Sequence, residues 1–231
     1  MTPGQLVNAV AIALNVPSET VVQHDRNLVV AGLRTKGGRG HSAPKVTPLD
    51  AARLVTAVLG SVRVLESVNT VLYLEQAIGT DGDGLFPELP QTHNFVEALA
   101  AIIAKANMPL MFEDFDKYMR QFAAYYIEVY VPRFDGAIAF DDESLKSILY
   151  HQSRVRVPRV GEEPKTDRDR FVSRACGIAQ DRKIQGNSIM ILGRAFLENG
   201  LTFKNTQEAM LGWPRSGAIT PKPKHTKKAA R

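Results

Sequence analysis

Apolar residues recur at helical spacing near the start of the chain. Over residues 5–15 they return every three or four positions, which predicts a helix capped by Thr2. The pattern breaks at residues 15–17, where an asparagine and a proline interrupt it. A second helix is then expected over residues 18–32, with Ser18 as its N-cap. The chain therefore opens with two short helices joined by a tight turn.

The rest of the chain is predicted to mix helices with a β-hairpin. Apolar spacing and capping signals predict helices over residues 47–60, 65–78, 94–106, 113–122, 145–150 and 187–198. The first of these is expected to be capped by Thr47, with Asp50 as the reciprocal carboxylate. Alternating apolar residues predict strands over residues 124–131 and 137–140, joined by a turn. Residues 155–183 leave helix and strand open, with a strand over 171–178 as one option. The expected fold class is α+β and mainly helical.

Composition narrows the class of protein without deciding its function. Hydrophobic residues make up 44% and charged residues 23% of the chain, as in an ordinary soluble globular protein. No apolar run approaches the roughly 20 residues that a membrane helix needs, so no membrane association is expected. The single cysteine, Cys176, excludes an internal disulfide and a multi-cysteine zinc site. A reducing cytoplasm is the expected location.

Positive charge is concentrated in two segments that contain no acid. The last 23 residues, from Ala209 onward, hold six lysines and arginines, so the rest of the chain carries only about −1 of the total of +5. The other segment runs from Arg26 to Lys45 and holds five basic residues. Such local concentrations of charge suit a polyanionic partner, although a basic tail is also common as plain solvated surface.

The turn between the first two helices carries a recognisable pattern. Its key positions are a small residue where the helices cross, a left-handed turn residue and an apolar anchor in the second helix, here Ala11, Asn15 and Val21. The pattern, which also includes Leu14, Val16, Pro17 and Thr20, resembles the helix-turn-helix family of bacterial transcription regulators. The family usually has glycine at the turn position that Asn15 occupies. Residues 28–33, followed by basic glycine-rich sequence, resemble the exit and wing of its winged members.

This resemblance implies a set of DNA contacts. The second helix would enter the major groove as a recognition helix, and the segment 34–45 would form a wing that grips phosphates or the minor groove. The contacts implied on the helix are Ser18, Thr20, Gln23, His24, Arg26 and Asn27, and those on the wing are Arg34, Lys36, Arg39 and Lys45. Gln23 suits adenine or a phosphate, and Thr20 suits a thymine methyl or a phosphate.

The same region also allows two other interpretations, a plain helical hairpin and a phosphate-binding loop. The two helices can be an ordinary helical hairpin, which would leave the basic segment after them unexplained. The glycine-rich segment 37–42 lacks the spacing of a nucleotide-binding P-loop, and Lys36 stands on its wrong side.

Signals for an enzyme or a metal site are weak elsewhere in the chain. Asp81 and Asp83 resemble the start of a calcium loop, but the twelfth position is Thr92 rather than a glutamate. The five histidines lack metal-ligand spacing and are expected at the surface or on DNA. Acids at 141–143 suit a nuclease metal site less well than a helix start. Cys176 has basic neighbours but is expected to be buried and inert. We therefore expect no enzyme activity, no cofactor and no metal.

The expected organisation has three parts. Residues 1–80 form a winged helix-turn-helix domain with trailing helices, and a loop at 79–87 marks its boundary. Residues 81–215 form an α+β domain for oligomerisation or partner binding and contain the hairpin. Residues 216–231 form a basic disordered tail.

The expected function is a sequence-specific transcription regulator of bacterial or prophage type, cytoplasmic and associated with the nucleoid. Its partners would be double-stranded DNA, a second copy in a homodimer, and RNA polymerase or another transcription factor. The alternative is a phage-type DNA-packaging or assembly protein, like a small terminase subunit, in which the helix-turn-helix grips the packaged DNA. An enzyme that uses this module to reach DNA is a third class.

Overall fold

The structure, a computed structural model, describes residues 1–36, 45–106, 125–131, 135–140, 146–151 and 180–198. Its helices are α1 (Pro3–Leu14), α2 (Ser18–Val30), α3 (Pro48–Gly60), the 3-10 helix η1 (Val64–Glu66), α4 (Ser67–Glu75), α5 (Phe95–Lys105) and α8 (Gly186–Glu198). Its strands are β1 (Ile78–Thr80), β2 (Thr92–Asn94), β3 (Tyr125–Val131), β4 (Asp135–Phe140), β5 (Ser147–Tyr150) and β6 (Gln180–Gln185). These elements confirm the expected α+β class.

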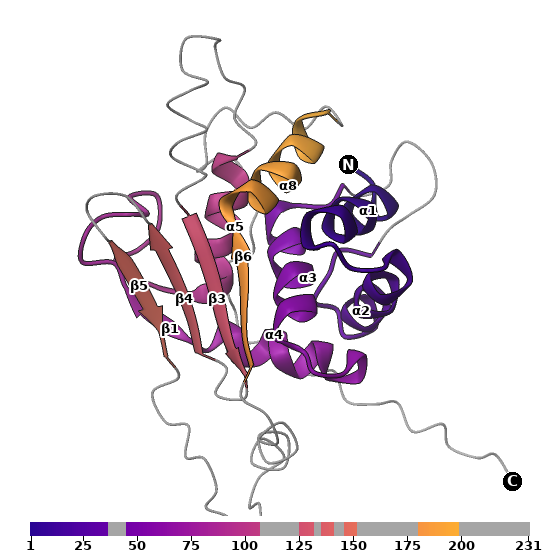
Figure 1. Ribbon diagram of the computed structural model, residues 1–231, viewed down its shortest axis with the longest axis horizontal. Coiled ribbons are helices and arrows are strands. Elements are labelled where there is room, and N and C mark those ends of the chain that lie inside the picture. Colours follow the sequence, from indigo (N-terminus) through magenta and orange to yellow (C-terminus); the bar gives the residue numbers. More distant parts are fainter. Residues whose placement is uncertain (37–44, 107–124, 132–134, 141–145, 152–179, 199–231) are drawn as a thin grey trace, which may run out of the picture.

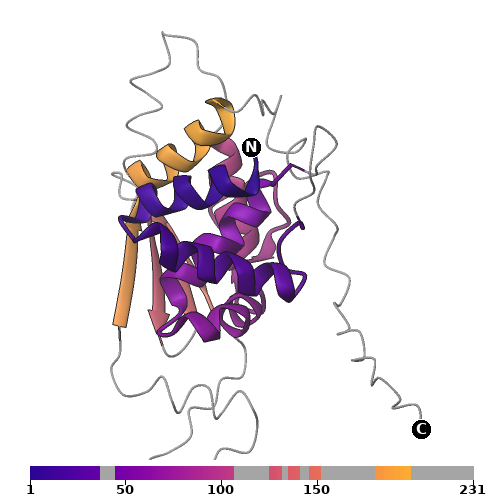
Figure 2. The same cartoon turned by 90° about the vertical axis from the view of Figure 1, so that its right-hand side faces the viewer.

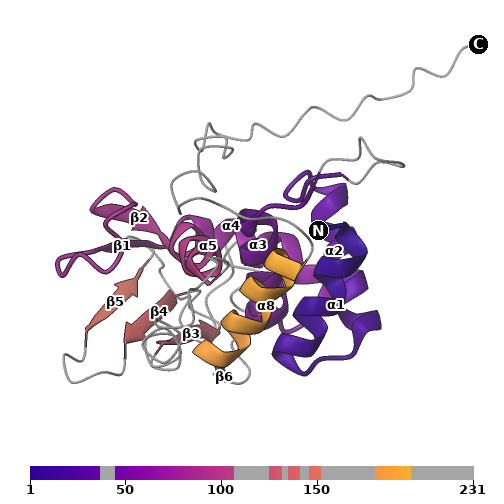
Figure 3. The ribbon, with the colours of Figure 1, turned by 90° about the horizontal axis from the view of Figure 1, so that it is seen from above.

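The helices and the larger sheet occupy opposite sides of the described part (Figure 1). The strands lie on one side, α3 and α5 pack behind them, and α1 and α2 form the outermost layer on the other side (Figure 3). Turned to face the viewer, α1 lies above α2 and both lie in front of the other helices (Figure 2). The α1–α2 pair therefore presents a surface that faces away from the sheet.

The larger sheet is antiparallel throughout, in the order β5-β4-β3-β6. Strands β3 and β4 form the hairpin predicted from sequence, with Tyr130 opposite Asp135 next to the turn. Strands β1 and β2 form a separate antiparallel pair. A single bridge between Ile78 and His151 brings this pair to the end of β5.

Local capping signals set the starts of three helices, two of them at the caps predicted from sequence, Thr2 and Thr47. Thr2 and Gln5 form a reciprocal capping box at the start of α1. Thr47 and Asp50 do the same for α3, and Asn94 with Glu97 for α5. Ser18 does not cap α2, because Pro17 occupies the N-cap position and Ser18 is already helical. That prediction was wrong by one position.

Helix α3 is the centre of the described fold. Apart from Arg53, its residues are all buried, including Leu54 and Val55 at 0% exposure. It packs against α5 and α4, and the glycine that ends it, Gly60, lies against Val129 of β3. One hydrophobic cluster runs through the described residues from Met1 to Phe196. The helical layer and the sheet thus share one core.

The domain boundary expected after residue 80 falls within elements that share this core. The boundary falls between β1 and β2, which pair with each other, and α1 packs against α8, the last helix of the described residues. The loop after β1 is stabilised by its own hydrogen bonds, because the Asp81 carboxylate accepts from the backbone N–H groups of Leu85 and Phe86 at 2.9 and 2.7 Å. The expected tail, 216–231, lies outside the described residues.

Two secondary-structure predictions need correction. Residues 145–150 were expected to be helical, but 147–150 form β5, in which Ile148 and Tyr150 are buried while their neighbours are exposed. This alternation is the period of a strand and was too short to recognise in sequence. The helix expected over 65–78 ends at Glu75, and Ile78 begins β1. The helix expected over 113–122 and the optional strand over 171–178 lie outside the described residues.

Candidate nucleic-acid interface

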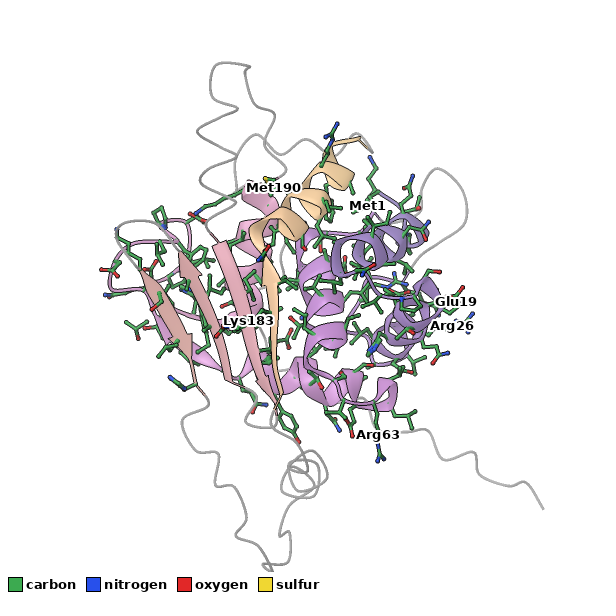
Figure 4. The ribbon with its side chains drawn as sticks, in the orientation of Figure 1. Met1, Glu19, Arg26, Arg63, Lys183 and Met190 are labelled. Carbon is green, nitrogen blue, oxygen red and sulfur yellow. The ribbon has the colours of Figure 1, made fainter. Side chains whose placement is uncertain are left out.

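Helix α2 has one exposed face. Glu19, Gln23, Arg26 and Val30 recur at intervals of three or four residues and are all exposed, which places them in one stripe along the helix. We call these four residues the α2 face. The opposite side of the helix carries its buried residues, among them Val21 and Leu28 at 0% exposure. The side chains of Glu19 and Arg26 point outward together from α2 (Figure 4).

The turn before α2 has the geometry predicted from sequence. Asn15 adopts a left-handed backbone with φ of 51° and ψ of 48°, which asparagine tolerates better than most residues. The backbone N–H of Val16 donates to the carbonyl of Ala11 at 3.0 Å and closes the end of α1. Val21 is fully buried beneath the turn, and Ala11 is half-buried. These contacts fix the direction in which α2 leaves α1.

Two predicted DNA contacts on α2 instead hold the helix in the fold. His24 is buried, and its Nδ1 lies 2.8 Å from the Ser67 hydroxyl of α4. The Asn27 side-chain amide donates to the Val64 carbonyl at 2.8 Å. Both side chains therefore tie α2 to η1 and α4, and neither belongs to the α2 face. Ser18 and Thr20 are half-buried at the start of the helix.

Arg34, expected on the wing, is also buried. Its guanidinium forms a bidentate ion pair with the Asp25 carboxylate of α2, through Nε to Oδ1 and through Nη2 to Oδ2 at 2.7 Å. Burial raises the pKa of Asp25, and the hydrogen bond and charge of Arg34 oppose that rise. Arg34 is thus an internal partner of α2, and its predicted role as a phosphate contact was wrong.

The two wing lysines that the structure describes are exposed. Lys36 and Lys45 stand on either side of residues 37–44, which lie outside the described part together with the predicted contact Arg39. Burial lowers the pKa of the Met1 amine, and the nearby charge of Lys45 lowers it further. The ammonium group of Lys45 therefore lies near Met1, beside the start of α1.

Arg63 is a candidate contact that the sequence reasoning did not select. It is exposed and directly precedes η1, which lies beside α2 through the contact from Asn27 to Val64. Met1, Glu19, Arg26 and Arg63 all lie on the side formed by the first helices, away from the strand that carries Lys183 (Figure 4). No local signal marks Arg63, because its proximity to α2 depends on how η1 packs.

The other candidate chemical groups are structural where the structure describes them. His93, expected at the surface, is buried, with its Nε2 2.9 Å from the Tyr150 hydroxyl and its Nδ1 2.9 Å from the Pro90 carbonyl. Burial also raises the pKa of Tyr150. Within the described residues, no three His, Cys, Asp or Glu side chains gather as metal ligands, and no helix is long and apolar enough to cross a membrane. Cys176 and the acids at 141–143 lie outside the described residues.

Comparisons with protein-family models, curated proteins and solved structures find no match for this chain.

Proposed function

We propose that this protein binds double-stranded DNA, with the α2 face in the major groove and the neighbouring cations on the phosphates. The observation that carries the proposal is the α2 face itself. It is a stripe on an outer helix, preceded by a fixed turn and uncovered by the described residues. The amide of Gln23 and the guanidinium of Arg26 lie at its centre, with the carboxylate of Glu19 before them and the apolar Val30 after them. An α-helix fits the major groove of B-DNA, where base edges offer distinct patterns of donors and acceptors.

The exposed side chains fall into two groups, those suited to contact base edges and those suited to contact phosphates. Gln23 lies at the middle of the α2 face and has the amide that pairs with the N6 and N7 edge of adenine. Arg26, one turn further on, is positioned for a guanine or a phosphate. Lys36, Lys45 and Arg63 supply charge for phosphates at the edges of the contact.

The combination of base contacts and phosphate contacts is what a sequence-specific transcription regulator needs. As a dimer, such a protein reads two half-sites about 34 Å apart on a near-palindromic sequence. His24, Asn27 and Arg34 take no part in this interface, because their side chains are used inside the fold.

The test compares two alanine variants on two kinds of DNA. A preferred site is first selected from a random duplex pool, and fluorescence anisotropy then measures affinity for that site and for unrelated duplex. We expect Gln23→Ala to weaken the preferred site by about 1–3 kcal/mol and to leave unrelated DNA nearly unchanged, because Gln23 reads a base. We expect Lys36→Ala to weaken both about equally and to reduce the salt slope by about one, because Lys36 contacts phosphate.

Lys146 provides the matched control for charge. It precedes β5 in the sheet, on the other side of the described fold from α2, so Lys146→Ala should leave both affinities unchanged. The proposed role as a sequence-specific regulator would be contradicted if the selection enriches no sequence and Gln23→Ala does not change affinity. Tight binding of unrelated DNA in that case would favour a packaging protein instead.

A further inference from the structure

The buried carboxylate of Asp50 joins the two ends of the predicted wing, residues 34–45. Asp50 belongs to the first turn of α3 and is 2% exposed. It accepts hydrogen bonds from the backbone N–H and hydroxyl of Thr35, at 2.8 and 3.0 Å. It also accepts from the backbone N–H and hydroxyl of Thr47, at 2.8 and 2.9 Å. One side chain thus holds Thr35 and Thr47 beside each other.

Helix capping explains only half of these contacts. A capping box needs the carboxylate to accept from the N-cap backbone, which Thr47 provides. The bonds from Thr35 come from a residue 15 positions earlier in the chain and add nothing to the start of the helix. Their effect is to fix the chain that leaves α2 against the chain that enters α3.

The same contacts reach α2 through Arg34. Its guanidinium pairs with Asp25 on the buried side of α2 and donates from Nη1 to the Thr35 carbonyl at 2.6 Å. A continuous series of polar contacts therefore runs from α2 through Arg34 and Thr35 to Asp50. Because these groups are buried or half-buried, the series is shielded from competing water.

Two exposed cations lie within two positions of the residues that Asp50 holds. Lys36 follows Thr35, and Lys45 lies two positions before Thr47. Val46, which lies between Lys45 and Thr47, is buried, and its backbone N–H donates to the Met1 carbonyl at 3.4 Å. The backbone at both lysines is therefore anchored to the helical core, which limits where their ammonium groups can lie relative to the α2 face.

We propose that Asp50 is a positioning residue for DNA binding, which holds Lys36 and Lys45 where they meet phosphates while the α2 face lies in the groove. This inference rests on the proposed function and names the device that sets its phosphate contacts. Asp50 touches no DNA. Its contribution is preorganisation, because lysines held near their binding positions lose less freedom when DNA binds.

A double-mutant cycle on unrelated duplex DNA tests this role. In the wild-type background, Lys36→Ala should weaken binding about threefold, within the range for a single exposed ion pair, and reduce the salt slope by about one. In an Asp50→Asn background, Lys36→Ala should cost less than about 1.5-fold, because the lysine has already lost its position. Arg26→Ala is the control, and its cost should be the same in both backgrounds because α2 keeps its other supports.

The outcomes separate the two proposals. An undiminished threefold cost of Lys36→Ala in the Asp50→Asn background would overturn the positioning role while leaving DNA binding intact. A wild-type protein that binds no duplex DNA at low salt would overturn both. Where Asp50→Asn does not fold, Thr35→Val replaces it, because it removes one donor to Asp50 and keeps the Thr47 cap. A smaller cost of Lys36→Ala in that background supports the role, and an unchanged cost overturns it.

Discussion

Replacing Arg34 by methionine should lower the free energy of unfolding by about 3–5 kcal/mol at neutral pH. Arg34 and Asp25 expose only 6% and 10% of their side chains, so the change leaves a carboxylate buried without its partner. Burial already raises the pKa of Asp25, and loss of Arg34 should raise it further. Urea unfolding followed by circular dichroism measures the loss.

The pH dependence of this variant identifies the cause. A carboxyl whose pKa is higher in the folded than in the unfolded state binds a proton more readily when folded. The free energy of unfolding of the protein therefore rises as pH falls from neutral toward 3.8, the ordinary pKa of aspartate. The deficit of Arg34→Met should thus shrink as pH falls from 7 toward 4. The double variant Asp25→Leu, Arg34→Met should recover most of the loss, and a single variant within 1 kcal/mol of wild type would contradict the buried pair.

Substituting alanine for Gly193 should destabilise the fold by about 1–3 kcal/mol through overpacking. Gly193 lies in α8, and a Cβ placed on it would come within 2.4 Å of the backbone carbon of Ala106, just after α5. Backbone cannot move aside as a flexible side chain can, so α8 would have to shift away from α5. The loss is measured as a lower midpoint in urea at unchanged slope.

Gly4 provides the matched control for this substitution. It also lies in a helix, α1, and a Cβ there meets nothing within 4 Å. Gly4→Ala should therefore be neutral or slightly stabilising, because alanine favours the helix. Equal effects of the two substitutions would show that α8 does not pack closely against Ala106.

Sequence predicts this fold well where the signal is local. The capping boxes of Thr2 and Thr47 satisfy backbone groups within three residues, and the left-handed turn at Asn15 depends on a single residue type. The β3–β4 hairpin depends on alternation over neighbouring residues. Such signals need no knowledge of the rest of the chain, and the structure agrees with each of them.

The errors come from features that depend on distant contacts. His24 and Arg34 read as surface residues because polar side chains usually are, but Ser67 and Asp25 receive them inside the fold. Arg63 is a candidate DNA contact only because η1 packs beside α2. The packing of α8 against α1 likewise joins segments far apart in the sequence, which local patterns do not predict. Burial of a polar residue is a property of its tertiary partners.

The proposed DNA surface is accordingly smaller on α2 than the sequence implied. Gln23 and Arg26 keep their expected places on the exposed side, and Lys36 and Lys45 keep theirs next to it. Three other expected contacts instead stabilise the position of α2. Arg34, from the segment expected to grip DNA, instead holds α2 through Asp25. His24 and Asn27, expected to contact DNA from α2 itself, fix that helix to α4 and η1.

Charge reversal on α2 tests the central claim most directly. The measurement is the dissociation constant for a duplex DNA, by fluorescence anisotropy at low salt, for wild type, Arg26→Glu and the control Lys146→Glu. Both variants change the net charge by the same amount, but only Arg26 lies on the α2 face. The account predicts that Arg26→Glu weakens binding about tenfold or more and Lys146→Glu less than about twofold. Equal effects of the two reversals, or no binding by wild type, would contradict it.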